Sequence, residues 1–474
     1  MSILTRIMTF MLSIMLTITG WVGKMPVHTL QINRWETYQT NEGFGTSAAW
    51  WAQNIEDEAE AERIAALLYN KETGLGLDIF RFNVGGGEKE NPDSVVAIES
   101  RKAESFWVWN EENESYAFDF TRDANAVRMM DLAVKNGASK IILFCNSPHF
   151  SLTENGRASG SAEEGRCNLP PENYGAFVDY QLTVAEHFVS LGYPIYGISP
   201  INEPQWNWGT GWVSQEGCHY SAEEAVALLE CFAEEMIRRD EPFKLLCPES
   251  GQMDWNDIAY EEAFFGSELL MRYCDTYSGH SYWLDGNTEQ KQAAGERFAA
   301  NAPGMKFEMS EWCELPLRLD SDSVESGLLM ANVMYEDLTL LNAVSWQSWT
   351  AVNGDGLMDY RDGQLVQFQR YYIMKQFAKI PMGAKRVGVL DSHLEKTKLK
   401  TVAYICGDRD YLIVINNETE ADTVKLNGAY FSESVFVTSA GRRCEQVQDG
   451  RFSRTLTVEP QSVTTVILSR SPTC

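Results

Sequence analysis

Residues 175–203, GAFVDYQLTVAEHFVSLGYPIYGISPINE, contain the pattern that decides the fold. The first half has apolar residues at spacings of three and four from Phe177 to Leu191, which predicts an amphipathic helix ending at Gly192. The second half is a short apolar run, Tyr196–Pro200, typical of a buried strand. A helix followed by a buried strand is one repeat of an α/β protein with a parallel sheet.

The same unit recurs along most of the chain. Further strands are predicted near Gly43 and at Leu77–Val84, Lys140–Asn146, Phe243–Cys247, Asp275–Gly279, Met305–Met309 and Val344–Trp349. Amphipathic helices separate them, and one begins with a capping box of Ser221 and Glu224. Eight such units predict a (β/α)8 TIM barrel over residues 41–383, because a doubly wound sheet usually has a Gly-rich dinucleotide turn after its first strand.

The nearest candidate for such a turn is Gly85-Gly86-Gly87. It follows a predicted strand, but Glu88 comes next and no Lys-Ser/Thr pair stands nearby, so a phosphate site has little support. A close backbone approach to a substrate, or a plain loop, is the better interpretation.

The last part of the chain, residues 384–474, changes to alternating apolar and polar residues with polar turns. The strands predicted there are Lys400–Ile405, Tyr411–Ile415, Thr423–Leu426, Val435–Thr438, Thr455–Val458 and Val463–Leu468. This pattern predicts a β-sandwich. A side sandwich can bind carbohydrate or brace the barrel, and we favour bracing.

The N-terminus indicates export. Arg6 precedes an uncharged stretch, Ile7–Gly23, that is rich in Met, Leu and Ile, so residues 1–23 are predicted to be a signal peptide. A retained signal anchor and a spurious extended start are the alternatives. We therefore expect a secreted or cell-surface protein with no membrane contact beyond a possible N-terminal anchor.

Composition excludes several classes of protein. With 39 Lys and Arg against 67 Asp and Glu, the net charge of −28 disfavours nucleic acid and anionic membrane surfaces as partners. Ten Cys contain no CxxC pair and six His contain no HExxH motif, so neither a metal nor a cofactor is predicted. Most of the Cys are expected to be buried thiols, although Cys167 and Cys218 could form a disulfide in an exported protein.

Two glutamates at predicted strand ends point to glycoside hydrolysis. Glu203 lies in ISPINEPQ and Glu311 in MSEWC. The carboxyl ends of barrel strands meet at one mouth, where one carboxylic acid can protonate a departing oxygen and a second carboxylate can act at the anomeric carbon. A separation of about 5 to 5.5 Å predicts retention, and about 6.5 to 9.5 Å predicts inversion. Other acids that compete for these roles are Glu88, Glu249, Glu308 and Glu314.

Six motifs are shared with one known family. They are Glu42–Ser47 with Trp50-Trp51-Ala52, Arg81–Gly87, Asn146-Ser147-Pro148, Asn202-Glu203-Pro204, Ser278–Trp283 and Ser310-Glu311-Trp312. On these residues the chain resembles glycoside hydrolase family 30, a retaining clan A family with a TIM barrel and a side β-sandwich. The resemblance implies Glu203 as acid/base and Glu311 as nucleophile. It also implies a cleft that includes Arg81, Asn202, His280 and Tyr282, and a strand of the sandwich from residues 24–40.

Within the family, Pro204–Trp208 and Ser214–Tyr220 most resemble the endo-β-1,6-galactanase branch. One departure concerns the sequence after Asn-Ser-Pro, where many members have Pro and two aromatic residues including Trp. Here His149 begins His-Phe-Ser-Leu, which leaves the sugar preference of this region open. His149 either contacts substrate or has a structural role.

The substrate class expected is a neutral β-linked polysaccharide, because an acidic protein would not attract an acidic one. Stacking faces close in sequence to the two acids are offered by Trp206, Trp208, Trp212, Trp283, Trp312 and Trp346, and at least two of them are expected to hold sugars. Trp51 and Asn83 are also predicted to lie at the binding site. Alternatives are another family 30 specificity (β-1,6-glucanase, β-xylanase, β-fucosidase or glucosylceramidase-like action) and a non-catalytic carbohydrate-binding protein.

Overall fold

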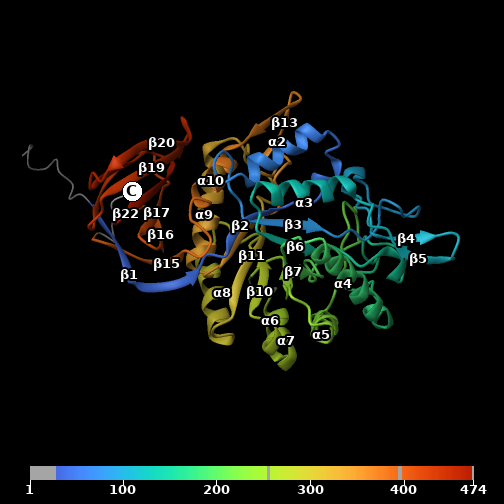
Figure 1. Cartoon of the computed structure of the whole chain (residues 1–474). Coiled ribbons are helices and arrows are strands. Elements are labelled where there is room, and N and C mark those ends of the chain that lie inside the picture. Colours follow the sequence, from blue (N-terminus) through green and yellow to red (C-terminus); the bar gives the residue numbers. More distant parts are fainter. Residues whose placement is uncertain (1–27, 254–256, 393–397, 472–474) are drawn as a thin grey trace, which may run out of the picture.

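The computed structural model describes residues 28–253, 257–392 and 398–471. A helix-covered barrel and an antiparallel sheet domain pack side by side (Figure 1). The predicted leader, residues 1–23, lies outside the described residues. None of the helices in the described part has the length and apolar character needed to cross a membrane.

The barrel sheet has the strand order β8-β7-β6-β3-β2-β12-β11-β10-β9, and its neighbours pair in parallel. The strands are β2 (Gly43–Ser47), β3 (Ile79–Asn83), β6 (Lys140–Phe144), β7 (Ile195–Ser199), β8 (Lys244–Leu245), β9 (Pro248–Ser250), β10 (Thr276–His280), β11 (Lys306–Trp312) and β12 (Ser345–Ser348). Only Leu246 and Cys247 separate β8 from β9, which pair with β7 and β10 respectively. These two short strands therefore act as halves of one strand, and the predicted TIM barrel is confirmed.

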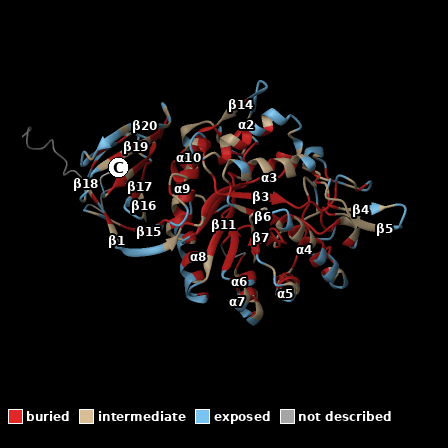
Figure 2. Ribbon diagram, in the orientation of Figure 1, coloured by how far each residue is buried: buried red, intermediate tan, exposed pale blue. Residues whose placement is uncertain are grey.

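Helices surround the barrel, and the strands inside it are buried (Figure 2). The α-helices are α2 (Glu58–Tyr69), α3 (Ala124–Asn136), α4 (Tyr174–Ser190), α5 (Ala222–Arg239), α6 (Ile258–Gly266), α7 (Glu268–Tyr273), α8 (Thr288–Asn301), α9 (Val324–Thr339) and α10 (Gln369–Phe377). Short 3-10 helices are η1 (Ala52–Asn54), η2 (Glu99–Arg101), η3 (Phe150–Leu152) and η4 (Pro171–Asn173). Helix α4 buries Phe177, Tyr180, Val184 and Phe188 at the predicted spacing. Helix α5 begins with the predicted capping box of Ser221 and Glu224.

The second sheet has the order β20-β19-β22-β17-β16-β15-β1-β18-β21. Its strands are β1 (His28–Thr40), β15 (Lys385–Asp391), β16 (Lys400–Cys406), β17 (Arg409–Asn416), β18 (Asp422–Asn427), β19 (Ser432–Ser439), β20 (Arg442–Arg451), β21 (Thr455–Val458) and β22 (Ser462–Ser469). Strand β1 pairs antiparallel with β15 and parallel with β18, so an N-terminal strand completes the C-terminal sandwich as expected.

Several strands were not predicted. Strand β15 was missed at the start of the sandwich, and β20 has mostly exposed polar residues because it is an edge strand paired only with β19. Two hairpins were also missed, β4 (Trp107–Asn110) with β5 (Ser115–Phe118) and β13 (Met358–Arg361) with β14 (Gln364–Gln367). An edge or a hairpin needs no buried alternating face, so hydrophobic periodicity does not reveal it.

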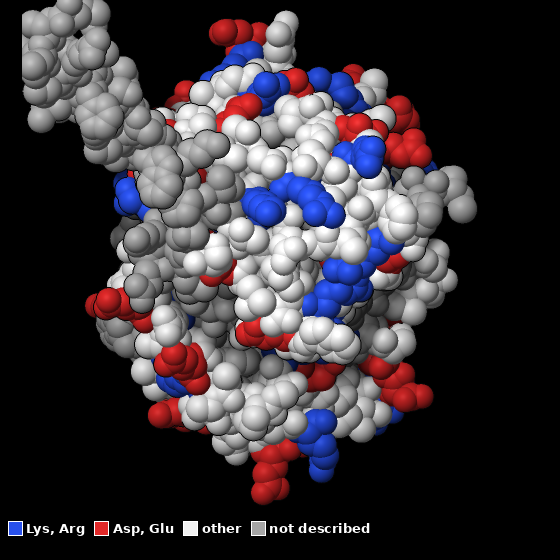
Figure 3. Space-filling model, turned by 90° about the vertical axis from the view of Figure 1, so that its left-hand side faces the viewer, with Lys and Arg blue, Asp and Glu red and all other residues white. Residues whose placement is uncertain are grey.

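The sandwich packs against the barrel through α9 and α10. Its side chains Tyr404, Ile413 and Ile415 belong to the same buried apolar cluster as the barrel helices. Gln376 of α10 donates to Thr438 Oγ1 at 2.9 Å. These contacts fit a bracing role. On the face of the molecule at the left of Figure 1, where the sandwich lies, acidic and basic side chains are interspersed (Figure 3).

The cysteines in the described part of the chain are free thiols. Cys167 and Cys218 are thiols whose side chains contact each other, and Cys247 contacts Cys274 in the same way. Burial raises the pKa of Cys145 above its ordinary value.

Candidate active site

Glu203 and Glu311 meet at the barrel mouth. Glu203 follows β7 and Glu311 lies on β11, and the two side chains are almost fully buried, at 8% and 4% exposure. A carboxylate oxygen of each and a ring nitrogen of His280 all lie within 4.8 Å of one another. The two acids are therefore close enough to act on one sugar ring.

The backbone is strained where it delivers these groups. Glu203 has a φ of 45° and Glu249 a φ of 59°. Both values lie in the left-handed region, which residues other than glycine seldom adopt. A backbone hydrogen bond of 2.9 Å from Glu203 N–H to the carbonyl of Glu249 joins the two strained positions. A Cβ on Gly251 would lie 2.8 Å from Glu203 Oε1, so only glycine leaves room for the carboxylate there.

Glu311 is held by two donors. Arg81 Nη1 lies 2.6 Å from Oε2, and the Tyr282 hydroxyl donates to Oε1 at 2.9 Å. Burial raises the pKa of Glu311, whereas His280 and Arg81 oppose that rise through their positive charge. Arg81 also donates to Asn202 Oδ1 at 3.2 Å, so one guanidinium orients both Glu311 and the residue that precedes Glu203.

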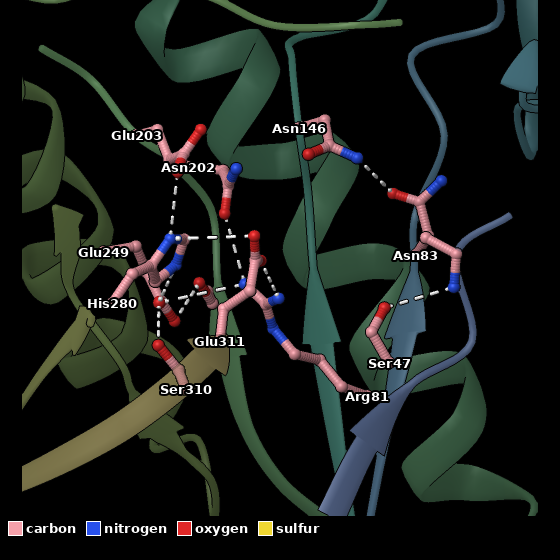
Figure 4. A network of polar contacts seen from close by, with 12 residues as sticks. Ser47, Arg81, Asn83, Asn146, Asn202, Glu203, Glu249, His280, Ser310 and Glu311 are labelled. Atoms are coloured by element: carbon pink, nitrogen blue, oxygen red, sulfur yellow. Dashed lines mark hydrogen bonds and ion pairs between the residues drawn. The ribbon is translucent and has the colours of Figure 1, made fainter. Parts of the chain in front are cut away.

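His280 lies between carboxylates (Figure 4). Its Nδ1 is 3.2 Å from Glu203 Oε1 and 3.7 Å from Glu311 Oε1, and its Nε2 is 3.1 Å from Glu249 Oε2. Burial by itself would lower the pKa of His280, but the three surrounding carboxylates raise it to about 10. The ring is therefore a cation at neutral pH.

A cavity of about 490 Å³ opens over the two acids. It is lined by Glu203, Trp206, Asn207, Trp208, Gly209, Thr210, Trp212, Val213, Ser214, Gln215, Tyr282, Trp283, Glu311, Leu315 and Trp349. Among the described residues that line it, the two glutamates are the only charged ones. Aromatic faces together with amide and hydroxyl groups suit a neutral, hydroxyl-rich ligand.

The loop of residues 206–216 carries three of the cavity tryptophans and is hydrogen-bonded to the loop that contains Gly85–Gly87. Glu216 is fully buried and accepts from Gly86 N–H at 2.9 Å and from Glu88 N–H at 3.2 Å. The backbone donors of the Gly85–Gly87 region thus bind a carboxylate of the same chain. Trp208 is fixed in turn, because its Nε1 donates to the carbonyl of Glu203 at 3.0 Å.

The predicted binding residues fall into two groups. Those near the acids or the cavity are Arg81, Asn202, His280, Tyr282, Trp206 and Trp208, together with the stacking candidates Trp212 and Trp283. Trp206 and Trp283 form an edge-to-face pair with ring centroids 5.1 Å apart. Trp212 and Trp283 are 72% and 43% exposed, which leaves their faces free for a sugar.

The second group lies away from the cavity lining. Trp346 is fully buried and donates to Asp337 Oδ2 at 2.9 Å, and Trp312 packs against it. Trp51 is buried and donates to the Ser47 carbonyl at 2.9 Å. Asn83 accepts from Asn146 Nδ2 at 3.1 Å.

His149 is fully buried among aromatic rings, including Trp107 and Tyr116. Burial lowers its pKa to about 4, so the ring is neutral. It is not one of the residues that line the cavity.

The competing acids are now separated by position. Glu88 accepts from Ala158 N–H at 2.7 Å, Glu308 from Ser345 Oγ at 2.7 Å, and Glu314 pairs with Arg370. Only Glu249 joins the cluster of the two acids. Trp349 and Leu315 of the cavity lining were missed, because no motif separates them from ordinary core residues.

Side-chain types that can hold a metal ion occur in this cluster, namely Glu203, His280 and Glu311. Positive charge is already supplied there by Arg81 against Glu311 and by the His280 cation. The donor set therefore fits acid–base chemistry by the chain itself better than a bound cation.

Comparison with known proteins agrees with this geometry. The model of O-Glycosyl hydrolase family 30 matches residues 27–366. An endo-β-1,6-galactanase from Hypocrea rufa is 24% identical over 423 residues, covering 84% of this chain and 83% of that protein. A conserved exported protein from Bacteroides fragilis has a similar crystal structure, with a TM-score of 0.85, 22% identity, and coverage of 93% of this chain and 100% of that one. A family 30 endoxylanase from Clostridium papyrosolvens C71 has a TM-score of 0.71 at 19% identity, again over 93% of this chain and 100% of its own.

Proposed function

The chain belongs to O-glycosyl hydrolase family 30, and we propose that it is a retaining glycoside hydrolase with Glu311 as nucleophile and Glu203 as acid/base. The observation that supports these roles is that one carboxylate oxygen of Glu203 and one of Glu311 lie within 4.8 Å of each other across the barrel mouth. Oxygens this close favour the short separation of the carboxyl groups, about 5 to 5.5 Å, of a double displacement over the about 6.5 to 9.5 Å of inverting enzymes.

In the first step, a carboxylate oxygen of Glu311 attacks the anomeric carbon. The bond from that carbon to the leaving oxygen breaks, and Glu203 gives its proton to that oxygen. In the second step, Glu203 takes a proton from water, whose oxygen attacks the anomeric carbon and releases Glu311. Arg81 and Tyr282 hold the nucleophile in place by hydrogen bonds to its two oxygens.

The substrate that we propose is β-1,6-galactan, cleaved internally. Two features support this choice: the similarity to an endo-β-1,6-galactanase over 84% of the chain, and a cavity whose described lining residues include no Lys or Arg. A neutral polymer can lie on Trp206, Trp208, Trp212 and Trp283 without burying an unpaired charge.

A panel of defined oligosaccharides tests the substrate. Purified protein is incubated with β-1,6-galacto-, β-1,6-gluco- and β-1,4-xylo-oligosaccharides, and the products are measured by mass spectrometry. We expect cleavage of the galactan series with internal products. Faster cleavage of the glucan or xylan series would assign another specificity, and binding without any cleavage would indicate a carbohydrate-binding protein.

Chemical rescue tests the role of Glu203. In Glu203→Ala the second step lacks its base, and added azide can attack the glycosyl-enzyme without one. We expect a β-glycosyl azide, with retained configuration, from an activated aryl β-galactoside. Rescue that gives the α-azide would contradict the double displacement.

We also propose that the protein acts outside the cytoplasm, because residues 1–23 have the composition of a signal peptide. Expression with these residues, followed by fractionation and N-terminal sequencing, tests this. Intact protein that stays in the cytoplasm would contradict it.

A further inference from the structure

Glu249 is a buried carboxylate with no role in the two steps above. It lies on β9, is 1% exposed, and is not among the residues that line the cavity. Both of its oxygens are nevertheless engaged. Oε1 accepts from Ser199 Oγ at 2.8 Å, and Oε2 accepts from Ser310 Oγ and lies 3.1 Å from His280 Nε2 and 3.8 Å from Arg81 Nη2.

These contacts keep Glu249 ionised. Burial would raise its pKa, but Arg81, His280 and Ser310 outweigh burial and lower the pKa to about 2. An ionised carboxylate only accepts hydrogen bonds, so the nitrogen that faces it must be protonated. Nε2 of His280 therefore carries its proton permanently, and any proton exchange is left to Nδ1.

Nδ1 is the nitrogen that faces the reacting acids. It lies 3.2 Å from Glu203 Oε1 and 3.7 Å from Glu311 Oε1, and the titratable ring of Tyr282 is 5.8 Å from the His280 ring between centroids. The cluster contains three carboxylates against two cations, Arg81 and His280, so it has one carboxylate more than its cations. With a fixed proton on Nε2, Nδ1 is the ring nitrogen that faces the two acids of the proposed reaction.

We propose that Glu249 is a positioning residue that fixes the proton on Nε2 of His280 and aims Nδ1 at the gap between Glu203 and Glu311. It acts through His280 and touches neither the sugar nor the reacting atoms. The part of this proposal that concerns proton position stands on the contacts above, whereas its effect on turnover rests on the proposed hydrolase function.

Imidazole NMR tests the proton position without any substrate. The full chain is labelled with 15N-histidine, and the His280 signals are assigned by their loss in His280→Gln. In the unaltered protein we expect both ring nitrogens of His280 to stay protonated through neutral pH. In Glu249→Gln, which keeps the shape but loses the charge, we expect the His280 titration midpoint to fall by about 1 to 3 pH units.

Glu308→Gln is the matched control. Glu308 is another buried carboxylate of the barrel, 2% exposed and held by Ser345 and Ser278, and it makes no contact with His280. We expect its His280 titration to match that of the unaltered protein. An equal shift in both variants, or no shift in Glu249→Gln, would overturn the proposal.

Kinetics on β-1,6-galacto-oligosaccharides test the consequence. For Glu249→Gln we expect kcat to fall by about 10- to 100-fold with KM nearly unchanged, and part of the loss to be recovered as pH is lowered and His280 is protonated again. An unchanged kcat and pH profile would overturn the positioning role. If the NMR shift is seen but even the unaltered protein cleaves no glycan, the proton anchor stands and the hydrolase proposal fails.

Ser310→Ala covers the case in which Glu249→Gln does not fold. It removes one donor to Glu249 and the longer hydrogen bond, 3.3 Å, from Ser310 Oγ to the Gly279 carbonyl. We expect a smaller fall of the His280 midpoint in the same direction, together with a kcat loss of about 3- to 10-fold. Unchanged His280 titration in a folded Ser310→Ala protein would count against Glu249 as the anchor.

Discussion

Two largely buried ion clusters differ in the balance of their charges and in their access to the cavity. The mouth cluster is Arg81, Glu203, Glu249, His280 and Glu311. The wall cluster is Lys291, Glu336, Asp337 and Lys400. In the wall cluster, fully buried Lys291 and Asp337 pair at 2.8 Å, and Lys400 of the sandwich reaches Glu336 at 3.2 Å.

The two clusters differ in the balance of their charges and in their access to the cavity, and this difference supports the proposed catalytic role of the mouth cluster. The wall cluster has two cations for two carboxylates, and Asp337 also accepts from Ser281 and Trp346, so its charges are paired and sealed from the cavity. The mouth cluster has one carboxylate more than its cations, and two of its acids line the cavity. Excess negative charge that reaches a cavity suits the proton transfer that we propose for the mouth cluster, whereas the paired charges of the wall cluster suit a structural role.

The largest expected effect breaks the mouth cluster. In Glu311→Gln the nucleophile is lost, so we expect kcat/KM on the best glycan substrate to fall by about 10⁴-fold or more. Burial raises the pKa of Glu311, so its ionised form adds little to the stability of the folded protein. Its removal should therefore leave the free energy of unfolding nearly unchanged. Steady-state kinetics and urea unfolding check the two parts, and a variant that keeps most of its activity would remove Glu311 from the nucleophile role.

The next effect breaks the wall cluster. In Asp337→Asn the buried Lys291 loses its charge partner, and we expect the free energy of unfolding to fall by about 3 to 5 kcal/mol. The folded fraction should retain kcat within about twofold, because the wall cluster does not reach the cavity. Thermal and urea unfolding measure the stability, and a selective loss of kcat without loss of stability would reverse the assignment of the two clusters.

A third prediction concerns pH. The folded-state pKa of His280, about 10, lies above the ordinary value, so its stabilising effect is complete below about pH 6.5 and is lost as pH rises through 10. Across that window the unaltered protein should lose up to about 1.4 kcal/mol of unfolding free energy per pH unit more than His280→Gln. Urea unfolding at stepped pH measures the difference, and parallel curves would show that His280 is not held as a cation.

The smallest effect concerns the cavity wall. For Trp283→Ala we expect KM to rise by about 10-fold with little change in kcat, since the lost stacking acts on ground state and transition state alike. Trp35→Ala is a suitable control, because Trp35 is 95% exposed on β1 and is not part of the cavity lining. Equal KM values for the two variants would show that Trp283 holds no sugar.

The mouth cluster shows which site residues can be predicted from the sequence and which cannot. Strand-end motifs predicted that Glu203, Glu311 and Arg81 lie at the barrel mouth, where the structure brings them together, because barrel topology sends all strand ends to one mouth. The motif could not separate Trp312 from a cavity residue, although Trp312 directly follows Glu311. Successive residues of a strand point to opposite faces, so Glu311 reaches the mouth while Trp312 is buried against Trp346.

Trp312 was predicted at the site but lies away from the cavity, whereas Glu249 was not selected but lies in the mouth cluster. Among the competing acids the sequence offered no reason to prefer it, since Pro-Glu-Ser after a short strand is an ordinary pattern. Its importance comes from contacts with Ser199, His280 and Ser310, which lie 31 to 61 residues away in the chain. Periodicity and motifs describe neighbours along the chain and are silent about such contacts.

By itself, the amino-acid sequence determined the alternation of strands and helices, the family, and the choice of the two glutamates that we propose as catalytic, because these depend on local periodicity and on short motifs. Only the tertiary structure decided which carboxylates share His280, which tryptophans keep an open face, and which charges are sealed. Those outcomes depend on distances between residues far apart in sequence, and on a burial that shifts each pKa according to its neighbours in space.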